Sequence, residues 1–185
     1  VNVYHVDFSN RLLQISPTPV ISSIIGGNPV LANVGSVRTD GIDIAGTVHF
    51  GNNFSFYNAL SYNRSQYADN YSNGAALVLT AGKNVPGSPE WLNKFVASAT
   101  FGDIEVQLIG DYVGKRYATY TNDLSVPSYF LMGLGVSGKL PAMASWLKNP
   151  RWRLNVSNLA NKDYWLNSHY LGDPRTVQFS AQLEF

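Results

Sequence analysis

The sequence predicts an all-β protein in which antiparallel strands follow one another as a meander and form a barrel that crosses a membrane. Apolar and polar residues alternate along about eight segments, which is the period of a strand with two different faces. Tight turns alternate with long connections, and aromatic residues gather at both ends of the segments. With 45% hydrophobic and only 14% charged residues among 185, the composition excludes a long disordered chain.

Composition also excludes several other classes of protein. The chain has no cysteine, so a disulfide scaffold and cysteine-based zinc sites are excluded. A formal net charge of +1 is too balanced for a surface that neutralises phosphates, and we therefore expect no nucleic-acid partner. The longest nearly apolar stretch, residues 129–136, is far shorter than the roughly 18 residues that a membrane helix needs.

In the first half of the chain we expect strands over residues 1–13, 42–50 and 54–67. The alternation is clearest in the second of these, where Ile42 and Ile44 share the face opposite Asp43. In the third segment Asn58 interrupts an otherwise apolar face.

In the second half we expect strands over residues 89–101, 104–112, 127–139, 152–157 and 176–185. The last is the clearest, because every second residue from Val177 to Phe185 is apolar and the residues between them are polar. We expect one set of side chains to face hydrocarbon: Val106, Leu154, Val177 and Phe179. We expect the alternating polar set to face the barrel interior: Asp43, His49, Glu105, Gln107, Asp111, Arg153, Gln178, Gln182 and Glu184.

The connections between these strands alternate in length. Residues 51–53 and 102–103 are tight turns of Gly, Asn and Asp, and residues 140–150 form a moderately longer connection. Four connections are long and rich in Gly, Pro, Asn, Ser and Tyr: residues 14–35, 68–88, 118–126 and 165–174. In a meander, alternate connections lie at the same end, so the short turns are expected at one rim and the long loops at the other, as in outer-membrane barrels.

Aromatic residues support the membrane interpretation. One group lies beside the short turns or the carboxyl terminus: Phe50, Phe54, Phe101, Trp152 and Phe185. A second group lies toward the long loops: Tyr62, Trp91, Tyr112, Tyr129 and Tyr164. Two such belts flank the apolar band of a lipid-embedded barrel, because aromatic rings favour the headgroup boundary. The alternative is a soluble β-sandwich with an aromatic core, which also has strands of period two.

Catalytic, metal and cofactor motifs are weak. Residues 133–138 match G-x-G-x-x-G, but Pro141 follows at once and a dinucleotide-binding helix has no room to begin there. His5, His49 and His169 are too scattered for a metal site, and no nucleophile motif is present, so we predict no catalytic residues, metal or cofactor. Side chains in the long loops that can stack on or pair with a planar or anionic ligand are Arg116, Tyr117, Tyr120, Trp165, His169 and Tyr170.

An ordered series of motifs resembles the barrel of TonB-dependent outer-membrane receptors. The run NVSNLANKDY at residues 155–164, GDPRT at 172–176 and the last strand resemble the final two strands of that family. Residues 33–43 resemble its N-x-G and R-x-x-G-[VI]-[ED] strand, and GKNVPGSP at residues 82–89 resembles its entry into a later strand. YVGKRY at 112–117 and PSY at 127–129 fit the following pair of strands.

This resemblance implies that residues 1–185 are a carboxyl-terminal segment, the last third of a 22-stranded barrel in the bacterial outer membrane. We expect the signal peptide, TonB box and plug domain to lie outside this chain. The implied function is active uptake of an iron-siderophore or another scarce nutrient. The implied partners are membrane lipid, the other strands and plug of the receptor, and TonB through the plug region. The alternative functions are a self-contained eight-stranded barrel with a structural or adhesive role and a soluble binding module.

The resemblance also implies that the last strand is an assembly signal. In outer-membrane proteins a terminal aromatic strand is read by the barrel-assembly machinery, and strand pairing at an open edge is a suitable mode of recognition. The apolar residues expected to carry the signal are Phe179, Leu183 and Phe185.

Overall fold

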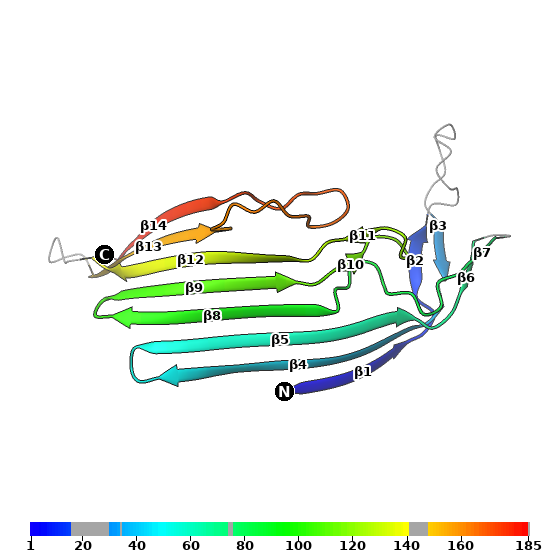
Figure 1. Ribbon diagram of the computed structural model, residues 1–185, viewed down its shortest axis with the longest axis horizontal. Helices are drawn as coiled ribbons and strands as arrows, with labels where there is room; N and C mark the ends of the chain where they lie inside the picture. Colours follow the sequence, from blue (N-terminus) through cyan, green and yellow to red (C-terminus); the bar gives the residue numbers. More distant parts are fainter. Residues whose placement is uncertain (16–29, 34, 74–75, 141–147, 185) are drawn as a thin grey trace.

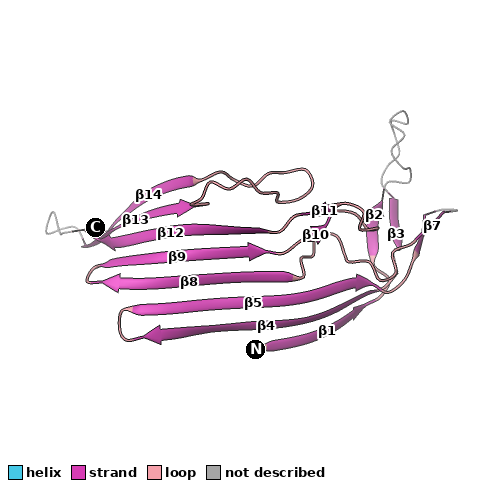
Figure 2. Ribbon diagram, in the orientation of Figure 1, coloured by secondary structure: helices cyan, strands magenta, loops and turns pink. Residues whose placement is uncertain are grey.

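The computed structural model describes residues 1–15, 30–33, 35–73, 76–140 and 148–184 (Figure 1). Eight antiparallel strands form one sheet in the order β1 (Asn2–Phe8), β4 (Val37–Phe50), β5 (Phe54–Tyr67), β8 (Trp91–Phe101), β9 (Ile104–Val113), β12 (Tyr129–Lys139), β13 (Lys148–Ser157) and β14 (Thr176–Glu184). Long strands that follow one another in the chain are also neighbours in the sheet, which confirms the predicted meander. Within the described ranges, no helix is long and apolar enough to cross a membrane, and the drawn elements are all strands (Figure 2).

The two kinds of connection separate to opposite ends of the sheet (Figure 1). The β4–β5 and β8–β9 turns lie at one end, which we call the short-turn end. Gly51 and Gly102 adopt φ values of 63° and 59° there, a left-handed conformation that glycine enters without steric cost. The opposite end, called the long-loop end, carries the extended connections. The predicted separation of short and long connections is therefore confirmed.

Short strand pairs inside the long connections were not predicted. They are β2 (Leu12–Ile15) with β3 (Val30–Asn33), β6 (Tyr71–Asn73) with β7 (Ala76–Val78), and β10 (Arg116–Tyr117) with β11 (Ser125–Val126). The single strand expected over residues 1–13 is wrong, because Asn10 turns the chain at φ 55° between β1 and β2. The strand expected from residue 42 begins earlier, at Val37, since residues 37–43 pair with β1 as well as with β5.

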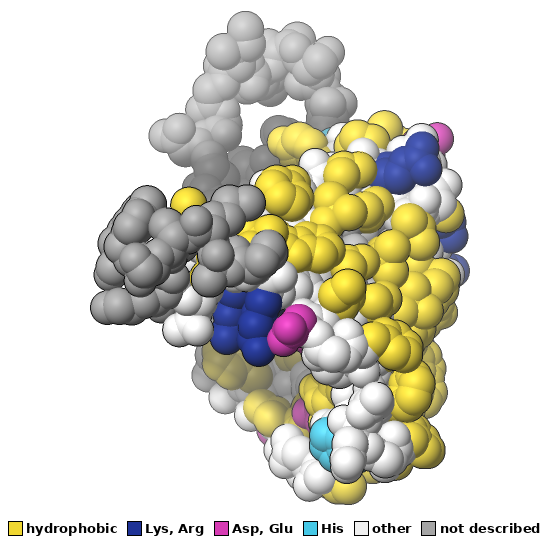
Figure 3. Space-filling model, turned by 90° about the vertical axis from the view of Figure 1, so that its left-hand side faces the viewer, with side chains coloured by type: hydrophobic (Ala, Val, Ile, Leu, Met, Phe, Trp, Pro, Cys, Tyr) yellow, Lys and Arg dark blue, Asp and Glu magenta, His cyan; other side chains and the backbone are white. Residues whose placement is uncertain are grey.

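The pairing register shows which side chains share a face, because directly paired residues of antiparallel strands point to the same side. Val106 pairs through Val136 and Leu154 with Phe179, and this row lies on the side that we call the apolar face. Gln107 pairs through Gly135 and Asn155 with Gln178 on the opposite side, the polar face. Viewed from the short-turn end, hydrophobic side chains gather along the right-hand side of the molecule (Figure 3).

Aromatic residues border the apolar face at both ends, as predicted, except for Tyr129 and for Tyr164, whose ring contacts that of Tyr129 at 4.7 Å. Phe54 and Phe101 contact each other at 5.9 Å between ring centres at the short-turn end, and Tyr62 and Trp91 at 4.7 Å toward the long loops. Tyr129 was expected in this second belt, but it pairs with Val113 and therefore lies on the polar face. The next residue, Phe130, pairs with Tyr112 and takes the place in the belt. Phe185 lies outside the described residues.

Buried side chains concentrate at the long-loop end rather than behind the sheet. Val37, Tyr67, Tyr71 and Val85 form one buried cluster there, with Val78 and Tyr120 packed against it. In the sheet itself large apolar side chains are exposed, including Val177 at 64% and Phe179 at 67%. Such an apolar surface is far larger than the isolated exposed residues of soluble proteins, which accords with a sheet that faces lipid.

The sheet architecture also bears on the two alternative folds. A sandwich requires a second sheet packed on the first, whereas the described chain has one eight-stranded sheet and three two-stranded pairs. A self-contained barrel requires β1 to pair with β14, but these strands are the two edges of the sheet. The described residues therefore form an open, curved segment of a barrel.

Candidate functional site

The connection between β5 and β8 folds back over the end of β5. Tyr67 donates its backbone N–H to Lys83 O at 3.0 Å, and Val85 donates to Ser65 O at 3.0 Å. Val85 is buried in the middle of the GKNVPGSP run, and the residue before it, Asn84, forms an isolated bridge with Gln66. The run therefore acts as a short extra strand that fixes this loop at the long-loop end.

The connection between β9 and β12 is attached to that loop. Asn84 donates its backbone N–H to the side-chain oxygen of Asn122 at 2.7 Å, and Asn122 Nδ2 donates back to Asn84 O at 2.9 Å. Asn122 adopts φ 61°, a left-handed conformation that asparagine tolerates better than most residues. The ring of Tyr120 packs edge-on against Tyr67 at 6.3 Å. The two loops thus form one packed layer.

Asp123 is held by hydroxyl groups of the same loop. Thr119 and Thr121 both donate to its Oδ1, the latter at 2.7 Å. Because these hydrogen bonds favour the ionised form, they lower the pKa of the Asp123 carboxyl below its usual value. Burial, by contrast, raises the pKa of Tyr71 in the neighbouring cluster.

Arg116 links this layer to the third long connection, between β13 and β14. Its Nη2 donates to the carbonyl oxygen of Trp165 at 2.7 Å and also to that of Leu166. The guanidinium lies 5.5 Å from the ring centre of Tyr129, which in turn contacts Tyr164 at 4.7 Å. Arg116 is only 6% exposed, and its guanidinium joins β10 to the β13–β14 connection.

The third connection is a compact hairpin with an exposed tip. Trp165 and Leu171 form an isolated bridge, and Leu166 donates its N–H to Tyr170 O at 2.9 Å. Asn167 Oδ1 accepts the backbone N–H groups of His169 and Tyr170 at 2.8 and 2.9 Å, which closes the turn. Trp165 is 44% exposed and Tyr170 is 68% exposed. The hairpin therefore presents aromatic side chains on a rigid base.

The six side chains predicted to contact a ligand separate into two groups. Trp165, His169 and Tyr170 are exposed on the hairpin, whereas Arg116, Tyr117 and Tyr120 are wholly or partly buried. Arg116 joins β10 to the hairpin. The Lys115 ammonium lies over the ring of Tyr117, 4.9 Å from its centre. Ligand contact by all six stays a prediction.

Sequence reasoning missed several apolar residues at this end. Leu124, Leu166 and Leu171 are about half exposed beside the predicted aromatics. A hollow of about 130 Å³ lies between residues 124–127 and residues Trp165, Asn167 and Ser168. Only the spacing of two loops far apart in sequence creates this hollow, so no local pattern could have indicated it.

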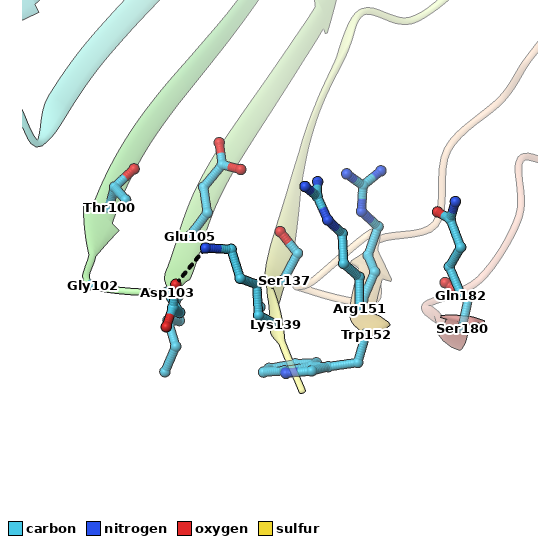
Figure 4. Close-up of a pocket in the computed structure, with 13 residues that line it drawn as sticks. Thr100, Gly102, Asp103, Glu105, Ser137, Lys139, Arg151, Trp152, Ser180 and Gln182 are labelled. Atoms are coloured by element: carbon cyan, nitrogen blue, oxygen red, sulfur yellow. Dashed lines mark ion pairs between the residues drawn. The ribbon is translucent and has the colours of Figure 1, made fainter. Parts of the chain in front are cut away.

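A second and larger hollow lies at the short-turn end of the polar face (Figure 4). Its volume is about 460 Å³, and charged residues of β12 and β13 line it together with the β8–β9 turn. Lys139 Nζ lies 2.8 Å from Asp103 Oδ1, and Gln107 donates to Glu105 at 2.8 Å. Arg151 and Arg153 complete the charged lining.

A charged cluster that was not predicted lies on the apolar side of β1 and β4, toward the long-loop end. His5 contacts Asp40 at 2.6 Å and Asp7 at 3.0 Å, and Arg38 Nε donates to Asp7 at 3.1 Å. Asp40 is 35 residues from His5 in sequence, so the contact between them depends on the β1–β4 register. Across the described ranges, no group of three or more His, Cys, Asp or Glu residues is placed to hold a metal ion.

Comparison with known proteins places this sheet in a family. The sequence model of the family described as "TonB dependent receptor-like, beta-barrel" matches residues 1–159. The ferrioxamine receptor of Yersinia enterocolitica is 29% identical over 157 residues, which is 82% of this chain and 21% of that protein.

Solved structures agree in fold. The siderophore receptor PiuA from Acinetobacter baumannii superposes with a TM-score of 0.72 at 18% identity, covering 97% of this chain and 25% of PiuA. BauA, the ferric preacinetobactin receptor of the same organism, gives 0.72 at 22% identity, covering 99% of this chain and 26% of BauA. This chain therefore spans about one fifth to one quarter of these relatives. It belongs to the TonB-dependent receptors, the β-barrel family of the bacterial outer membrane.

Proposed function

We propose that residues 1–185 are the carboxyl-terminal third of the barrel of a TonB-dependent receptor that takes up a ferric siderophore. The observation that carries the proposal is the match of residues 1–159 to the family barrel, on a sheet with one apolar and one polar face. The remaining barrel strands, a plug domain, the TonB box and the signal peptide belong to the same receptor outside this chain. The family is one of receptors and transporters rather than of enzymes.

The long-loop end is the proposed outer surface, where the ligand first meets the receptor. Its exposed aromatics, Trp165 and Tyr170, stand on a hairpin whose base is tied to β10 through Arg116. Rigid aromatic side chains lose little conformational entropy on binding and supply large contact areas. His169 lies at the same tip and adds a polar group.

The first ligand class to test is a ferric hydroxamate of the ferrioxamine type. The relative at 29% identity is named a ferrioxamine receptor, and the sequence likeness covers 82% of this chain. The solved neighbours include receptors for ferric preacinetobactin and ferric citrate, so other siderophore classes belong in the same panel.

The proposed function is tested in the bacterium that carries the gene. We expect deletion of the gene to abolish growth on at least one ferric siderophore under iron limitation, and a plasmid copy of the intact gene to restore it. Uptake of radioactive iron from that complex should also cease when TonB is deleted, because the energy for transport comes through TonB. Normal growth and uptake on the whole siderophore panel in the deletion strain would contradict the proposal and favour a structural or adhesive barrel.

A further inference from the structure

The smaller hollow, at the long-loop end, lies between two loops that hydrogen bonds hold in place. It is lined by residues 124–127 on one side and by Trp165, Asn167 and Ser168 on the other. Leu124 donates its backbone N–H to Thr119 Oγ1 at 3.2 Å, and its carbonyl oxygen accepts the N–H of Ala118 at 2.9 Å. Arg116 holds the opposite wall by donating to the carbonyl oxygen of Trp165. Both walls are therefore fixed by contacts within the chain.

The hollow lies on the side of the barrel interior rather than on the lipid side. Val126 in its wall pairs directly with Arg116, and directly paired residues of antiparallel strands point to the same side. The guanidinium of Arg116 lies 5.5 Å from the ring centre of Tyr129, which belongs to the polar face. A solute that enters the barrel from the long-loop end can therefore reach the hollow.

The walls and rim of the hollow present apolar side chains to water. Leu124 and Trp165 in the walls are each about half exposed, and Tyr170 on the same hairpin is more exposed still. Apolar surface gathered around a concavity is typical of a site that binds an apolar group. The hollow therefore suits a part of a ligand that carries no polar atoms.

The charges around the hollow are unfavourable for an anion. None of the described residues that line it is charged. Arg116 is buried and its Nη1 is wholly covered, so its charge is not offered to a solute. Asp123 directly precedes Leu124, is exposed, and accepts two hydroxyl hydrogen bonds at Oδ1, which favour its ionised form. An anionic ligand would meet this carboxylate with no cation in the lining to compensate.

The volume of the hollow limits how much of a ligand it can hold. A water molecule occupies about 30 Å³ of the liquid, so about 130 Å³ hold a segment of about four groups of that size. Sites that enclose a whole drug-sized ligand have roughly 300–1,000 Å³. Only one arm of a metal complex fits inside, and the rest must lie outside the walls.

We propose that this hollow binds an aliphatic arm of an uncharged ferric siderophore, between Leu124 and Trp165, and that the receptor accordingly selects hydroxamate complexes. Each hydroxamate carries one negative charge and each catecholate carries two. A complex of Fe³⁺ with three hydroxamates is therefore neutral, whereas a complex with three catecholates is trianionic. The neutral complex suits apolar walls beside the Asp123 carboxylate. The inference rests on the proposed function, because it requires that the receptor takes up a ferric siderophore.

The test is equilibrium binding of radioactive ferric complexes to the full receptor in outer membranes. The probes are a linear ferric trihydroxamate with aliphatic arms, its analogue with ether oxygens in those arms, and a ferric triscatecholate. L124A should weaken binding of the aliphatic complex about five- to tenfold, because apolar contact is lost. It should leave binding of the ether analogue unchanged, which also shows that the variant is folded. L79A shortens an exposed leucine outside the lining and should leave both affinities unchanged.

A second variant, D123N, tests the selectivity for charge. Asparagine keeps an oxygen that can accept from Thr119 and Thr121 but removes the negative charge. Affinity for the triscatecholate should therefore rise several-fold at low ionic strength, where the repulsion is least screened. Affinity for the aliphatic trihydroxamate should not change.

Three results would overturn the inference: equal weakening of the aliphatic and ether complexes by L124A, no weakening of either, or tighter binding of the triscatecholate than of the trihydroxamate by the parent. Any of these leaves the proposed function intact as long as some ferric complex is bound and imported. No effect of L124A on any probe would also direct attention to a polypeptide as the occupant. A receptor that imports no ferric complex at all would refute the proposed function, and the inference with it.

Discussion

At the scale of single residues, Arg116 shows how a side chain predicted to meet a ligand can organise the binding surface instead. Its Nη2 donates charge-assisted hydrogen bonds to the carbonyl oxygens of Trp165 and Leu166. A buried cation that donates to backbone carbonyls and lies beside a tyrosine ring is costly to remove, since its partners lose their hydrogen bonds. The exposed hairpin tip therefore depends on a residue that lies beneath it.

Replacing Arg116 with Gln should loosen the hairpin without unfolding the sheet. We expect faster amide hydrogen exchange at Leu166 and Gly172, whose N–H groups bond to Tyr170 O and Tyr164 O, with a local loss of about 1–3 kcal/mol. Exchange within β4 and β5 should not change. The conservative variant R116K keeps the charge and N–H donors but lacks the planar guanidinium that lies beside Tyr129, so its exchange rates should lie between those of the parent and R116Q. Unaltered exchange at Leu166 in R116Q would show that the hairpin is stable without the hydrogen bonds from Arg116.

For residues near strand ends, the face of the sheet on which each side chain lies could be predicted only in part from the sequence. Tyr129 and Phe130 are adjacent aromatics, and either one could belong to the belt on the apolar face. The sequence offers no basis for choosing, because the choice depends on the register in which β12 pairs with β9. Within long strands the choice is fixed by many alternating residues, and there the register confirms that Val106, Leu154 and Phe179 share one face.

At the scale of elements, β5 and β8 share a polar pair, Asn58 and Asn93, on the apolar face. Asn93 Nδ2 donates to Asn58 Oδ1 at 3.1 Å and to Ala59 O at 3.1 Å, and Asn58 Nδ2 donates back at 3.4 Å. The ring pair Phe56 and Phe95 stacks beside it at 5.9 Å. The Asn58 interruption noticed in the sequence is therefore compensated by a partner on the neighbouring strand.

This compensation predicts a non-additive pair of substitutions. N93L leaves the Asn58 amide without its partner on a lipid-facing surface and should destabilise the receptor by about 1–2 kcal/mol. N58L/N93L removes both polar groups and should be close to neutral. Urea-induced unfolding of receptor folded into bilayers measures both free energies of unfolding. Additive losses in the double variant would mean that the two amides do not act as a pair.

The hairpin between β13 and β14 carries the ligand-contact prediction. Replacing Trp165 and Tyr170 with Ala in the full receptor should weaken binding of its ferric siderophore about tenfold or more, since both expose large aromatic surfaces. L79A, which shortens another exposed side chain at the same end, serves as the control. Affinity and surface abundance are measured separately. Unchanged siderophore affinity at normal surface abundance would contradict ligand contact and indicate that Trp165 and Tyr170 anchor the loop at the membrane interface.

Long elements were predictable and short ones were not, for a physical reason. The long strands could be predicted because apolar and polar residues alternate along their whole length. The pairs β2 with β3, β6 with β7, and β10 with β11 contain only two to four residues per strand, too few for a period to emerge. Both hollows likewise form between segments distant in sequence, and local patterns do not encode such distances.

At the scale of the whole molecule, the open edges at β1 and β14 are the main consequence of the architecture. An unpaired strand edge in lipid leaves backbone N–H and C=O groups without hydrogen-bond partners, so both edges need neighbouring strands. In the proposed receptor the other barrel strands supply them. The outer edge of β14 is thus free to be recognised before the barrel closes.

Deleting Phe185 from the full receptor should reduce the amount inserted in the outer membrane without altering ligand affinity per inserted molecule. Phe185 continues the apolar series of Phe179 and Leu183, and strand addition at this edge is the expected mode of recognition. F185Y retains an aromatic terminus and should insert normally. Insertion is measured by quantifying receptor in purified outer membranes. A deletion variant that inserts as well as the parent would refute the assembly role.

The central claim is that one face of this sheet meets lipid while the other faces a protein-filled interior, and two neighbouring residues of β13 and β14 test it most directly. Leu154 pairs with Phe179 on the apolar face, and Gln178 pairs with Asn155 on the polar face. The free energy of unfolding is measured by urea titration of the full receptor in bilayers. L154R should lose about 2–4 kcal/mol, because a charge enters hydrocarbon, whereas Q178R should change it only mildly. Equal losses for the two variants would contradict the membrane assignment of the faces.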